Sequence, residues 1–326
     1  MKVCIYGAGA IGGFIGTRLG AQGHVLSAVA RDATLSALRA NGMRLRMGGR
    51  EMQAPVAASD EPADLGAQDL VVVAVKAPGL PEVAARIAPL LDRDTVVLTA
   101  MNGVPWWFFS GMPGTCAQMQ LATLDSHGSI AAAIAARRVI GCVVHASCAV
   151  PEPGVVTHVM GHGLIIGEPA GGESERTANL ARELAGAGFE CTVSPRIQQD
   201  IWYKLWGNMT MNPISAFTGA TVDRILDDGL ASGFCLAIMK EAAAVGNAIG
   251  CPIVQSGEER IGVARKLGAF KTSMLQDVEA GKPIELDALL TVVREIAGRV
   301  EVPTPNLDAL LGVTRVFART RGLYPD

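Results

Sequence analysis

Three polar residues in the second half of the chain have the types and the spacing to bind a small polar substrate. Lys204, Asn208 and Asn212 are four residues apart, so on a helix they lie along one face. A solvated face would ordinarily carry Glu, Lys and Arg, and two asparagines lower helix propensity. The row therefore favours a substrate-binding face over a plain surface stripe. Pro213 predicts a kink or a helix end at Asn212.

The elements that position such chemistry begin at the N-terminus. Residues 3–6 have the length and β-branching of a buried strand, and the glycines after them have the G-x-G-x-x-G spacing of a dinucleotide-binding turn. The first glycine permits a tight turn, the second leaves room for a pyrophosphate, and the third lets helix and strand pack closely. The alternative is an ordinary turn between two packed elements. The predicted cofactor-binding residues here are Gly7, Gly9, Ala10, Ile11 and Gly12.

The end of the next predicted strand, 25–30, indicates which dinucleotide would bind. NAD-specific folds place an acidic residue there to hold the ribose 2'-hydroxyl, about 20 residues past the glycines. This chain has Arg31, which can pair a 2'-phosphate bidentately. Asp32 follows directly, but its position before 33–35 is typical of a helix N-cap. The pattern favours NADP(H) over NAD(H).

Two further strands end in polar residues. The apolar run 70–75 reads as a strand covered on both faces and leads into Lys76, and the strand 95–100 leads towards Asn102. Open α/β sheets bind ligands at the carboxyl ends of their strands. We therefore expect Lys76 and Asn102 to contact a ligand, with a solvated charge at a strand end as the alternative for Lys76.

Two other segments allow more than one interpretation. Residues 106–109 are four consecutive aromatics, which cannot all share one face of a helix or strand. They line a cleft or an interface, or they pack between domains, and packing is favoured. Ser273, Glu285 and Asp287 form a second polar concentration. By spacing alone, Ser273 is better read as a helix N-cap and the two carboxylates as first-turn residues that favour a helix dipole.

Length and composition limit the class of protein. The chain has 326 residues, of which 49% are hydrophobic and 18% charged, so two globular domains are expected. No stretch approaches the roughly 18 uninterrupted apolar residues of a membrane helix, and no leader pattern is present, which predicts a cytoplasmic protein. A net charge of -3 without basic runs argues against nucleic acid as a partner. The seven scattered cysteines have no metal-ligand spacing, so no metal is expected.

The predicted fold is α/β: an N-terminal Rossmann-type dinucleotide-binding domain followed by an all-helical C-terminal domain. Short strand-like segments at 139–150, 155–160 and 164–167 complete the first domain, with a helix at 174–187 and a last strand at 189–193. After residue 195 only 3.6-residue periodicity remains. The predicted domains are therefore 1–194 and 195–326. The helices expected in the second are 197–211, 230–249, 258–267, 285–300 and 306–319.

Taken in order, these motifs resemble the ketopantoate reductase family, whose members reduce 2-dehydropantoate to pantoate with NADPH. The resemblance covers nearly the whole chain and includes Ser273-Met274-x-Gln276-Asp277 and Glu285-x-Asp287. By position, it implies that Lys204 is the general acid and that Glu285 assists it. It further implies that Asn208, Asn212 and Ser273 hold the substrate, and that Lys76 and Asn102 contact the cofactor, with Asn102 also reaching the substrate.

The implied chemistry suits these residue types. Hydride delivered to C2 of a 2-oxo acid leaves negative charge on the carbonyl oxygen, which an ammonium group stabilises and protonates. A nearby Glu285 would keep Lys204 protonated. The chain departs from the family at the bulky 104–109 segment and at Leu289-Leu290-Thr291, so the pocket could suit a different 2-oxo acid.

Three interpretations of function remain open from the sequence. The first is an NADPH-dependent 2-oxo acid reductase acting on ketopantoate. The second is a paralogue acting on another 2-oxo acid, or an opine-type dehydrogenase. The third is a non-catalytic NADP-sensing module, which the intact Lys204, Asn208 and Asn212 row disfavours. The helical domain could pair with a second copy to form a homodimer, or the chain could remain monomeric.

Overall fold

The computed structural model describes residues 1–325, apart from the side chain of Thr115, and it separates into two compact units. Unit 1 consists of Met1–Asn102, Trp106–Gln120 and His127–Asp200. Unit 2 consists of Gly103–Pro105, Leu121–Ser126 and the chain from Ile201 onward. The main crossing point thus lies between residues 200 and 201, six residues beyond the predicted 194/195 division.

Hydrogen bonds explain why two short segments from the first half of the sequence belong to unit 2. The backbone N–H of Val104 donates to the carbonyl of Ala288 over 3.0 Å. The N–H groups of Ala122 and Thr123 donate to the carboxylate of Glu295 over 2.9 and 2.8 Å. These long-range contacts cannot be read from local periodicity.

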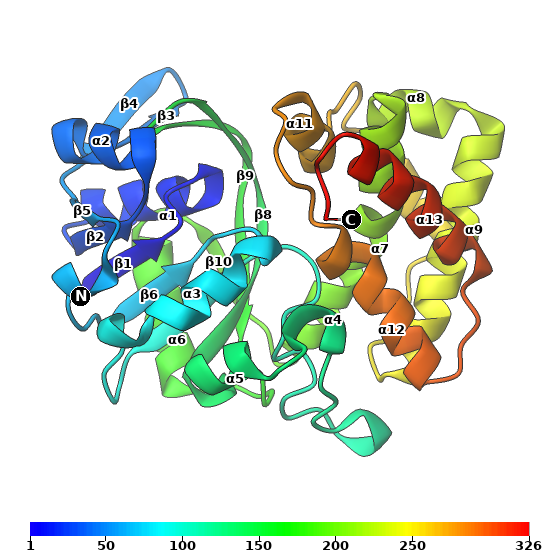
Figure 1. Ribbon diagram of the computed structural model, residues 1–326, viewed down its shortest axis with the longest axis horizontal. Helices are drawn as coiled ribbons and strands as arrows, with labels where there is room; N and C mark the ends of the chain where they lie inside the picture. The colour runs from blue at the N-terminus through cyan, green and yellow to red at the C-terminus, as the bar shows by residue number, and fades with distance from the viewer. Residues whose placement is uncertain (326) are drawn as a thin grey trace. The chain divides into compact units, whose positions relative to one another are not determined.

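Unit 1 is built on one mixed sheet (Figure 1). Its strands, in spatial order, are β4 (Arg50–Ala54), β3 (Met43–Met47), β9 (Val155–Gly167), β8 (Val139–Glu152), β7 (Val96–Ala100), β6 (Leu70–Val73), β1 (Lys2–Tyr6), β2 (Val25–Val29) and β5 (Ala57–Ser59), with β10 (Glu190–Val193) paired to β9. The stretch from β5 to β8 is all parallel. When these six strands are numbered by their order along the chain, their spatial order across the sheet is 3-2-1-4-5-6, which is the Rossmann order. The predicted fold class is confirmed for this unit.

Burial accounts for the central strands and the first helix. All four residues of β6 are buried, as expected for a parallel strand covered on both faces. Helix α1 (Ala10–Ala21) is buried along its middle, and its Phe14, Ile15 and Leu19 have no exposed surface. A helix that is apolar on most sides must pack within the fold. The other helices of the unit are α2 (Asp32–Asn41), α3 (Leu80–Arg86), α5 (Ser129–Ala133) and α6 (Glu175–Gly186).

The end of the sheet corrects one prediction. Residues 155–160 and 164–167 belong to a single strand, β9, which pairs with β8 as a long antiparallel hairpin. Gly161, which lies between the two predicted segments, has a positive φ of 76° and lies beside the register shift at His145 and Ser147. A Cβ at this position would lie 2.3 Å from the carbonyl oxygen of His145. The glycine therefore marks a bulge within one strand rather than a turn. The hairpin of β3 and β4, and strand β5, were not predicted.

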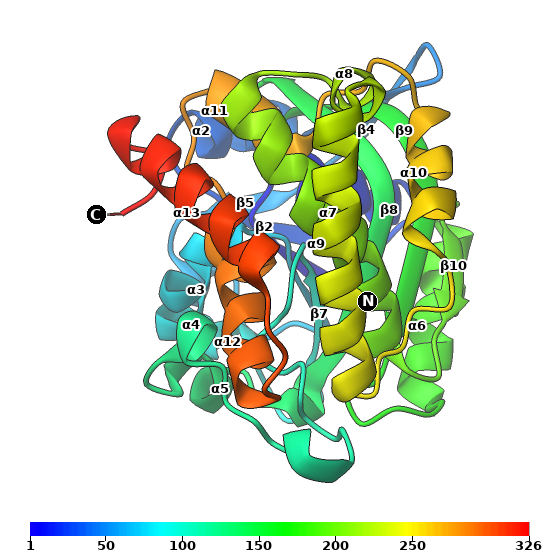
Figure 2. The ribbon, with the colours of Figure 1, turned by 90° about the vertical axis from the view of Figure 1, so that its right-hand side faces the viewer.

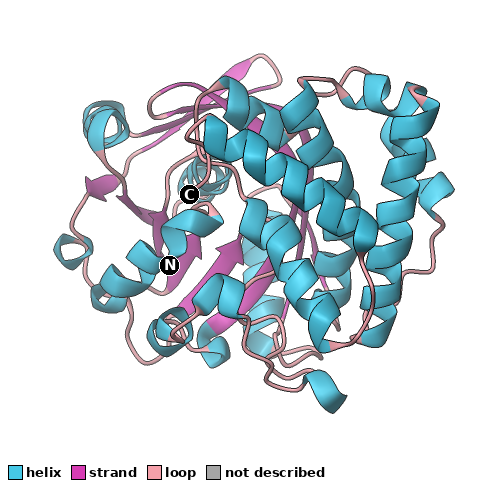
Figure 3. Ribbon diagram, turned by 45° about the vertical axis from the view of Figure 1, so that its right-hand side comes forward, coloured by secondary structure: helices cyan, strands magenta, loops and turns pink. Residues whose placement is uncertain are grey.

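Unit 2 contains helices and loops but no strand among its described residues (Figure 3). Helix α7 (Ile197–Thr218) packs beside α9 (Gly229–Ala248), as Figure 2 shows, and two buried indoles tie them together. Trp202 Nε1 donates to the carbonyl of Ala242 over 3.2 Å, and Trp206 Nε1 donates to that of Met239 over 2.7 Å. The remaining elements are α4 (Ala122–Asp125), α8 (Val222–Asp227), α10 (Gly257–Arg265), α11 (Ser273–Glu279), the π-helical turn Asp287–Thr291, α12 (Val292–Arg299) and α13 (Pro305–Thr320). Helices α8 and α11 were not among those predicted.

Of the two outcomes expected at Asn212, a kink or a helix end, helix α7 contradicts the helix end. The helix continues through Pro213 to Thr218. An interior proline removes one backbone hydrogen bond and costs about 3 kcal/mol. Here Met211, Ile214 and Ala216 are buried on either side of it, so tertiary packing offsets the local preference. Asn212 consequently keeps its place in the helical row.

Helix α9 is, by length and composition, apolar enough to cross a membrane, with a mean hydropathy of 1.3 over its best window. Lys240 and Glu241 interrupt it, and Cys235, Ile238 and Met239 pack inside the unit. A single helix of this kind is weak evidence for a membrane span, because packed helices of other proteins pass the same test.

The four consecutive aromatics 106–109 are all buried, each at most 7% exposed. They occupy a compact turn in which Ser110 N–H donates to the carbonyl of Trp107 over 2.8 Å. Trp106 Nε1 donates to the carbonyl of Ile134, and the Trp107 ring lies over Gly141, where a Cβ would be 2.4 Å from its Cη2 atom. Successive side chains of a turn point in several directions, so all four aromatic rings can be buried.

Candidate active site

The glycine turn joins the end of β1 to the start of α1 in unit 1. Gly7 has a φ of +96°, and a Cβ there would lie 2.8 Å from Val75 Cγ1. A Cβ on Gly12 would lie 2.1 Å from the carbonyl oxygen of Gly7. Gly9, in contrast, has nothing within 4 Å of its Cβ position. Two glycines thus allow close packing, and the middle one leaves open space.

That open space lies at the N-cap of α1, since Gly9 is the capping residue and Ala10 and Ile11 begin the helix. No acidic residue occupies the first turn. The first N–H groups of a helix are free of intrahelical partners, and its positive dipole end attracts anions. The residues present therefore fit the pyrophosphate of a dinucleotide.

The sheet brings the other predicted residues of unit 1 to the same edge. The chain leaves β1 towards β2 on one side and returns as β6 on the other, so a topological switch point lies between β1 and β6. Ala74 N–H donates to the carbonyl of Tyr6 over 3.0 Å, and Lys76 follows two residues later. Asn102 follows the neighbouring strand β7. Lys76 and Asn102 therefore lie at the carboxyl edge where ligands of such sheets bind.

Arg31 follows β2 at this edge, but its guanidinium already has a partner. Its Nη1 atom donates to both carboxylate oxygens of Glu82 over 3.0 Å, and its side chain is 64% exposed. Arg31 is also the N-cap residue of α2. Asp32 is the first helical residue, with a φ of +50°, so the prediction that Asp32 caps this helix is wrong.

Tyr6 is a polar residue of this edge that the sequence analysis missed. Its hydroxyl is buried and has no hydrogen-bond partner among the described residues. Burial raises the pKa of Tyr6, opposed by the nearby Arg86 guanidinium. A tyrosine at the end of the apolar run 3–6, directly before the first glycine, was the available signal.

In unit 2, α7 carries Lys204, Asn208 and Asn212 along one side of an uninterrupted helix. Lys204 and Asn208 are half-buried, and Asn212 is 7% exposed. The row of three is therefore intact, and none of its members lies on a fully exposed surface. These residues have the geometry for binding one small molecule along a single helix.

The other two predicted residues of unit 2 lie on separate elements. Ser273 is the first residue of α11, but the cap is Thr272, whose Oγ1 accepts from Leu275 N–H over 3.2 Å. The interpretation of Ser273 as the N-cap is therefore wrong. Glu285 is half-buried and lies just before the π-helical turn. It is therefore not in the first turn of a helix, where spacing alone would have placed it.

Asp287 begins the π-helical turn and accepts a hydrogen bond from the Tyr324 hydroxyl over 2.6 Å. Burial, together with this bond, raises the pKa of Tyr324 to about 12. Asp287 therefore supports the C-terminal segment. The turn itself contains Leu289-Leu290-Thr291, one of the departures from the family pattern. Gly103 packs on it, since a Cβ there would lie 2.3 Å from the carbonyl oxygen of Ala288.

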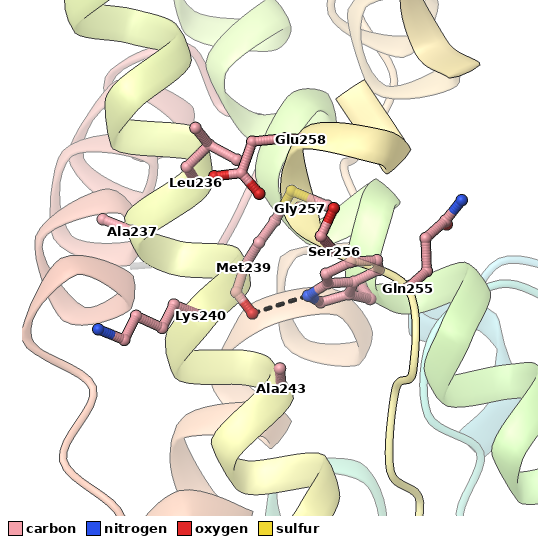
Figure 4. Close-up of a pocket in the computed structure, with 10 residues that line it drawn as sticks. Leu236, Ala237, Met239, Lys240, Ala243, Gln255, Ser256, Gly257 and Glu258 are labelled. Atoms are coloured by element: carbon pink, nitrogen blue, oxygen red, sulfur yellow. Dashed lines mark hydrogen bonds between the residues drawn. The ribbon is translucent and has the colours of Figure 1, made fainter. Parts of the chain in front are cut away.

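A hollow of about 400 Å³ on unit 2 involves none of the predicted residues. It lies between α9 and the loop before α10, and the lysine on its rim, Lys240, extends away from Gln255 and Ser256 (Figure 4). Within residues 1–325, no group of three or more His, Cys, Asp or Glu side chains is arranged to hold a metal ion.

The fold defines a class: a protein with a Rossmann-type sheet and an all-helical second unit. Family models narrow the class. Residues 3–171 match the model described as "Ketopantoate reductase PanE/ApbA", and residues 196–318 match its C-terminal counterpart. The chain belongs to the ketopantoate reductase family, which confirms the resemblance seen in the sequence.

Individual proteins agree with this assignment. A 2-dehydropantoate 2-reductase of Mesorhizobium japonicum is 45% identical, over 99% of this chain and all of the relative. A crystal structure of a candidate ketopantoate reductase from Ralstonia solanacearum is 56% identical, with a TM-score of 0.96 and 99% of each chain covered. The ternary structure of D-mandelate dehydrogenase with NADH and anilino(oxo)acetate shares the fold, with a TM-score of 0.83 at 20% identity and 99% of this chain and 100% of that chain covered.

Proposed function

We propose that this chain catalyses the NADPH-dependent reduction of a 2-oxo acid to a 2-hydroxy acid, with 2-dehydropantoate as substrate and (R)-pantoate as product. The observation that carries the proposal is the unbroken Lys204, Asn208 and Asn212 row in a chain that is 45% identical, end to end, to a 2-dehydropantoate 2-reductase. The proposal places the reaction in pantothenate biosynthesis, in the cytoplasm.

In the proposed reaction, NADPH supplies the hydride for C2 of the oxo acid. As the carbonyl oxygen gains negative charge, the Lys204 ammonium donates a hydrogen bond and then its proton, which gives the hydroxyl group. Glu285 keeps Lys204 protonated in the ground state. Asn208, Asn212, Ser273 and Asn102 orient the substrate through neutral hydrogen bonds, which fix its position without competing with the lysine charge.

The proposed cofactor site is the carboxyl edge of the sheet in unit 1. The N–H groups at the start of α1 face the pyrophosphate across the open space at Gly9. Arg31 selects the 2'-phosphate of NADP(H), and Lys76 and Asn102 complete the contacts. Residues 1–194 thus form the proposed NADP-binding domain, and residues 195–326 the substrate and catalytic domain.

A second candidate is reduction of a different 2-oxo acid, or an opine-type reaction on an imine. The observation that favours it is the departure of the sequence from the family pattern at the bulky segment 104–109 and at Leu289-Leu290-Thr291. D-mandelate dehydrogenase, with the same fold, was solved with the aromatic oxo acid anilino(oxo)acetate. Proteins of this shape are therefore not limited to one acid.

The decisive experiment is an NADPH-oxidation assay with 2-dehydropantoate and a panel of aliphatic and aromatic 2-oxo acids, repeated with NADH. We expect 2-dehydropantoate to give the highest kcat/KM, and NADPH to be preferred. A higher kcat/KM for another acid would support the second candidate. NADPH binding without turnover on any acid would contradict both and revive a non-catalytic sensor.

Assembly is a separate question, and we propose a homodimer. A solved ketopantoate reductase from Staphylococcus aureus, 21% identical and with a TM-score of 0.73, is described as dimeric. Light scattering coupled to size-exclusion chromatography distinguishes a dimer from a monomer. A mass of one chain at micromolar concentration would contradict the dimer.

A further inference from the structure

Arg260, in α10, carries a guanidinium group that has no counter-ion among residues 1–325. Its Nε atom is buried and has no hydrogen-bond partner, and the described part of the chain gives Arg260 no ion pair. Other arginines show the contrast: Arg265, five residues later in the same helix, is paired with Asp227. A partly buried cation without a counter-ion is costly unless an anion completes its environment.

Two residues of α7 contact this guanidinium without neutralising it. Its Cζ atom lies 5.1 Å from the centre of the Tyr203 ring, within range of a cation–π contact. The Tyr203 hydroxyl donates to Gln255 Oε1 over 2.7 Å, which fixes the ring. Gly207 provides the seat, because a Cβ there would lie 3.1 Å from both Nε and Nη2 of Arg260. The edge of the guanidinium that carries Nε and Nη2 therefore faces the backbone of α7, and Nη1 lies on the side away from it.

The seat lies beside the proposed general acid. Gly207 follows Lys204 by three residues on α7 and directly precedes Asn208. Residues three apart on a helix are neighbours on its surface. The Arg260 guanidinium, which comes from α10, thus lies against Tyr203 and Gly207, in the same turn of α7 that carries Lys204. A 2-oxo acid has two sites of negative charge during reduction, the carboxylate and the developing alkoxide, on adjacent carbon atoms.

We propose that Arg260 binds the carboxylate of the substrate while Lys204 protonates the adjacent carbonyl oxygen. This inference rests on the proposed function and adds a residue that determines specificity for acids. The planar guanidinium can donate two parallel hydrogen bonds to a carboxylate. Tyr203 and Gly207 are positioning residues, because they act only through Arg260.

Replacing the cation tests the proposal directly. In Arg260→Gln, KM for the 2-oxo acid should rise about 10- to 100-fold, as expected for losing hydrogen bonds to a charged group, and kcat should change by a smaller factor. Arg260→Lys should restore part of the loss. The amide of the same oxo acid lacks the carboxylate, so its kcat/KM should be the same in Arg260→Gln and the parent. Arg265→Gln, in the same helix, is the matched control and should leave KM unchanged.

Gly207→Ala is a second variant that keeps the charge and displaces it. The added Cβ would crowd the guanidinium, whereas alanine has the higher helix propensity, so Tm should not fall. We expect KM for the acid to rise although the protein is at least as stable. Tyr203→Phe keeps the ring and loses the bond to Gln255, and should have a smaller effect than Tyr203→Leu.

Calorimetric titration with the 2-oxo acid, in the presence of NADP⁺, separates this inference from the proposed function. If the parent enzyme reduces the acid and folded Arg260→Gln shows an unchanged KM, the inference is overturned. If the parent reduces no acid, the proposed function fails, and binding alone decides: loss of the binding heat in Arg260→Gln supports the carboxylate site, and equal binding overturns it.

Discussion

The two units present positive charge to anions in opposite ways. In unit 1, Arg31 is exposed and already paired with Glu82, and the glycine turn offers backbone N–H groups around the open space at Gly9. In unit 2, Arg260 is half-buried, stacked on Tyr203, and without a counter-ion in the described structure. An exposed ion pair contributes little free energy, so a ligand anion can replace Glu82 beside Arg31 at small cost. A partly buried cation without a counter-ion is already desolvated and positioned before its anion binds.

This difference suits two kinds of ligand. A dinucleotide is large, so many weak backbone contacts along the sheet edge can hold it, and one arginine has only to distinguish a 2'-phosphate from a hydroxyl. A 2-oxo acid is small, and each of its few polar groups must be met by a fixed side chain. The comparison predicts that substitutions in unit 2 act on turnover and substrate binding. Those in unit 1 should act on cofactor binding, apart from Asn102, which is also proposed to orient the substrate.

The largest expected effect comes from replacing Lys204, and it tests whether unit 2 carries the catalytic group. Lys204→Ala should lower kcat by about 100- to 10,000-fold, the usual contribution of a positioned general acid. NADPH binding should remain, because the dinucleotide contacts are proposed in unit 1. Steady-state kinetics and NADPH fluorescence titration measure the two. Lys240→Ala, an exposed lysine of α9, is the control, and equal turnover in both variants would refute the assignment of the acid.

The glycine turn offers a paired test of unit 1. Gly12→Ala forces a Cβ to 2.1 Å from the carbonyl oxygen of Gly7, so it should lower the free energy of unfolding by about 1–3 kcal/mol or more. Gly9→Ala meets nothing within 4 Å and should cost less than about 1 kcal/mol as a cap change, yet weaken NADPH binding. Chemical denaturation and cofactor titration separate these outcomes. If Gly9→Ala binds NADPH as tightly as the parent, the pyrophosphate does not approach there.

Arg31 should have an intermediate effect. In Arg31→Ala, the preference for NADPH over NADH should fall about 10-fold or more, because a charge-assisted bond to the 2'-phosphate is lost while NADH binding is unaffected. The ratio of the two dissociation constants is the measurement. An unchanged ratio would mean that selection of the phosphate lies elsewhere on the edge.

Local patterns in the sequence were enough for the fold class, and the order of the motifs along nearly the whole chain carried the resemblance to the family. The glycine spacing, the buried run before Lys76 and the helical period after residue 195 each depend on neighbouring residues, and each has its counterpart in β1, β6 and α7. The roles of the site residues were predicted from order and spacing, and they stay predictions until variants are measured.

What the sequence could not supply depends on long-range contacts. Glu82 meets Arg31 across 51 residues, and Arg260 meets Gly207 across 53, so neither pair leaves a local signal. From the sequence, Gly161 predicts a break, but the pairing of β8 with β9 makes it a bulge within one strand. From the sequence, Pro213 predicts a kink or a helix end, but its buried neighbours keep the helix continuous. In each case packing overrides the local preference.

The smallest expected effect concerns Glu82 and sharpens the contrast most. Because Glu82 holds the Arg31 guanidinium, it competes with a 2'-phosphate for the same donors. An exposed ion pair is worth about 0–1 kcal/mol, so Glu82→Gln should tighten NADPH binding by up to about 5-fold and leave NADH binding unchanged. Glu61→Gln is the matched control, since Glu61 pairs with Arg86 rather than Arg31. Weaker NADPH binding in Glu82→Gln would show instead that the ion pair positions Arg31 for the 2'-phosphate. In that case both units would hold an arginine in position before the anion binds.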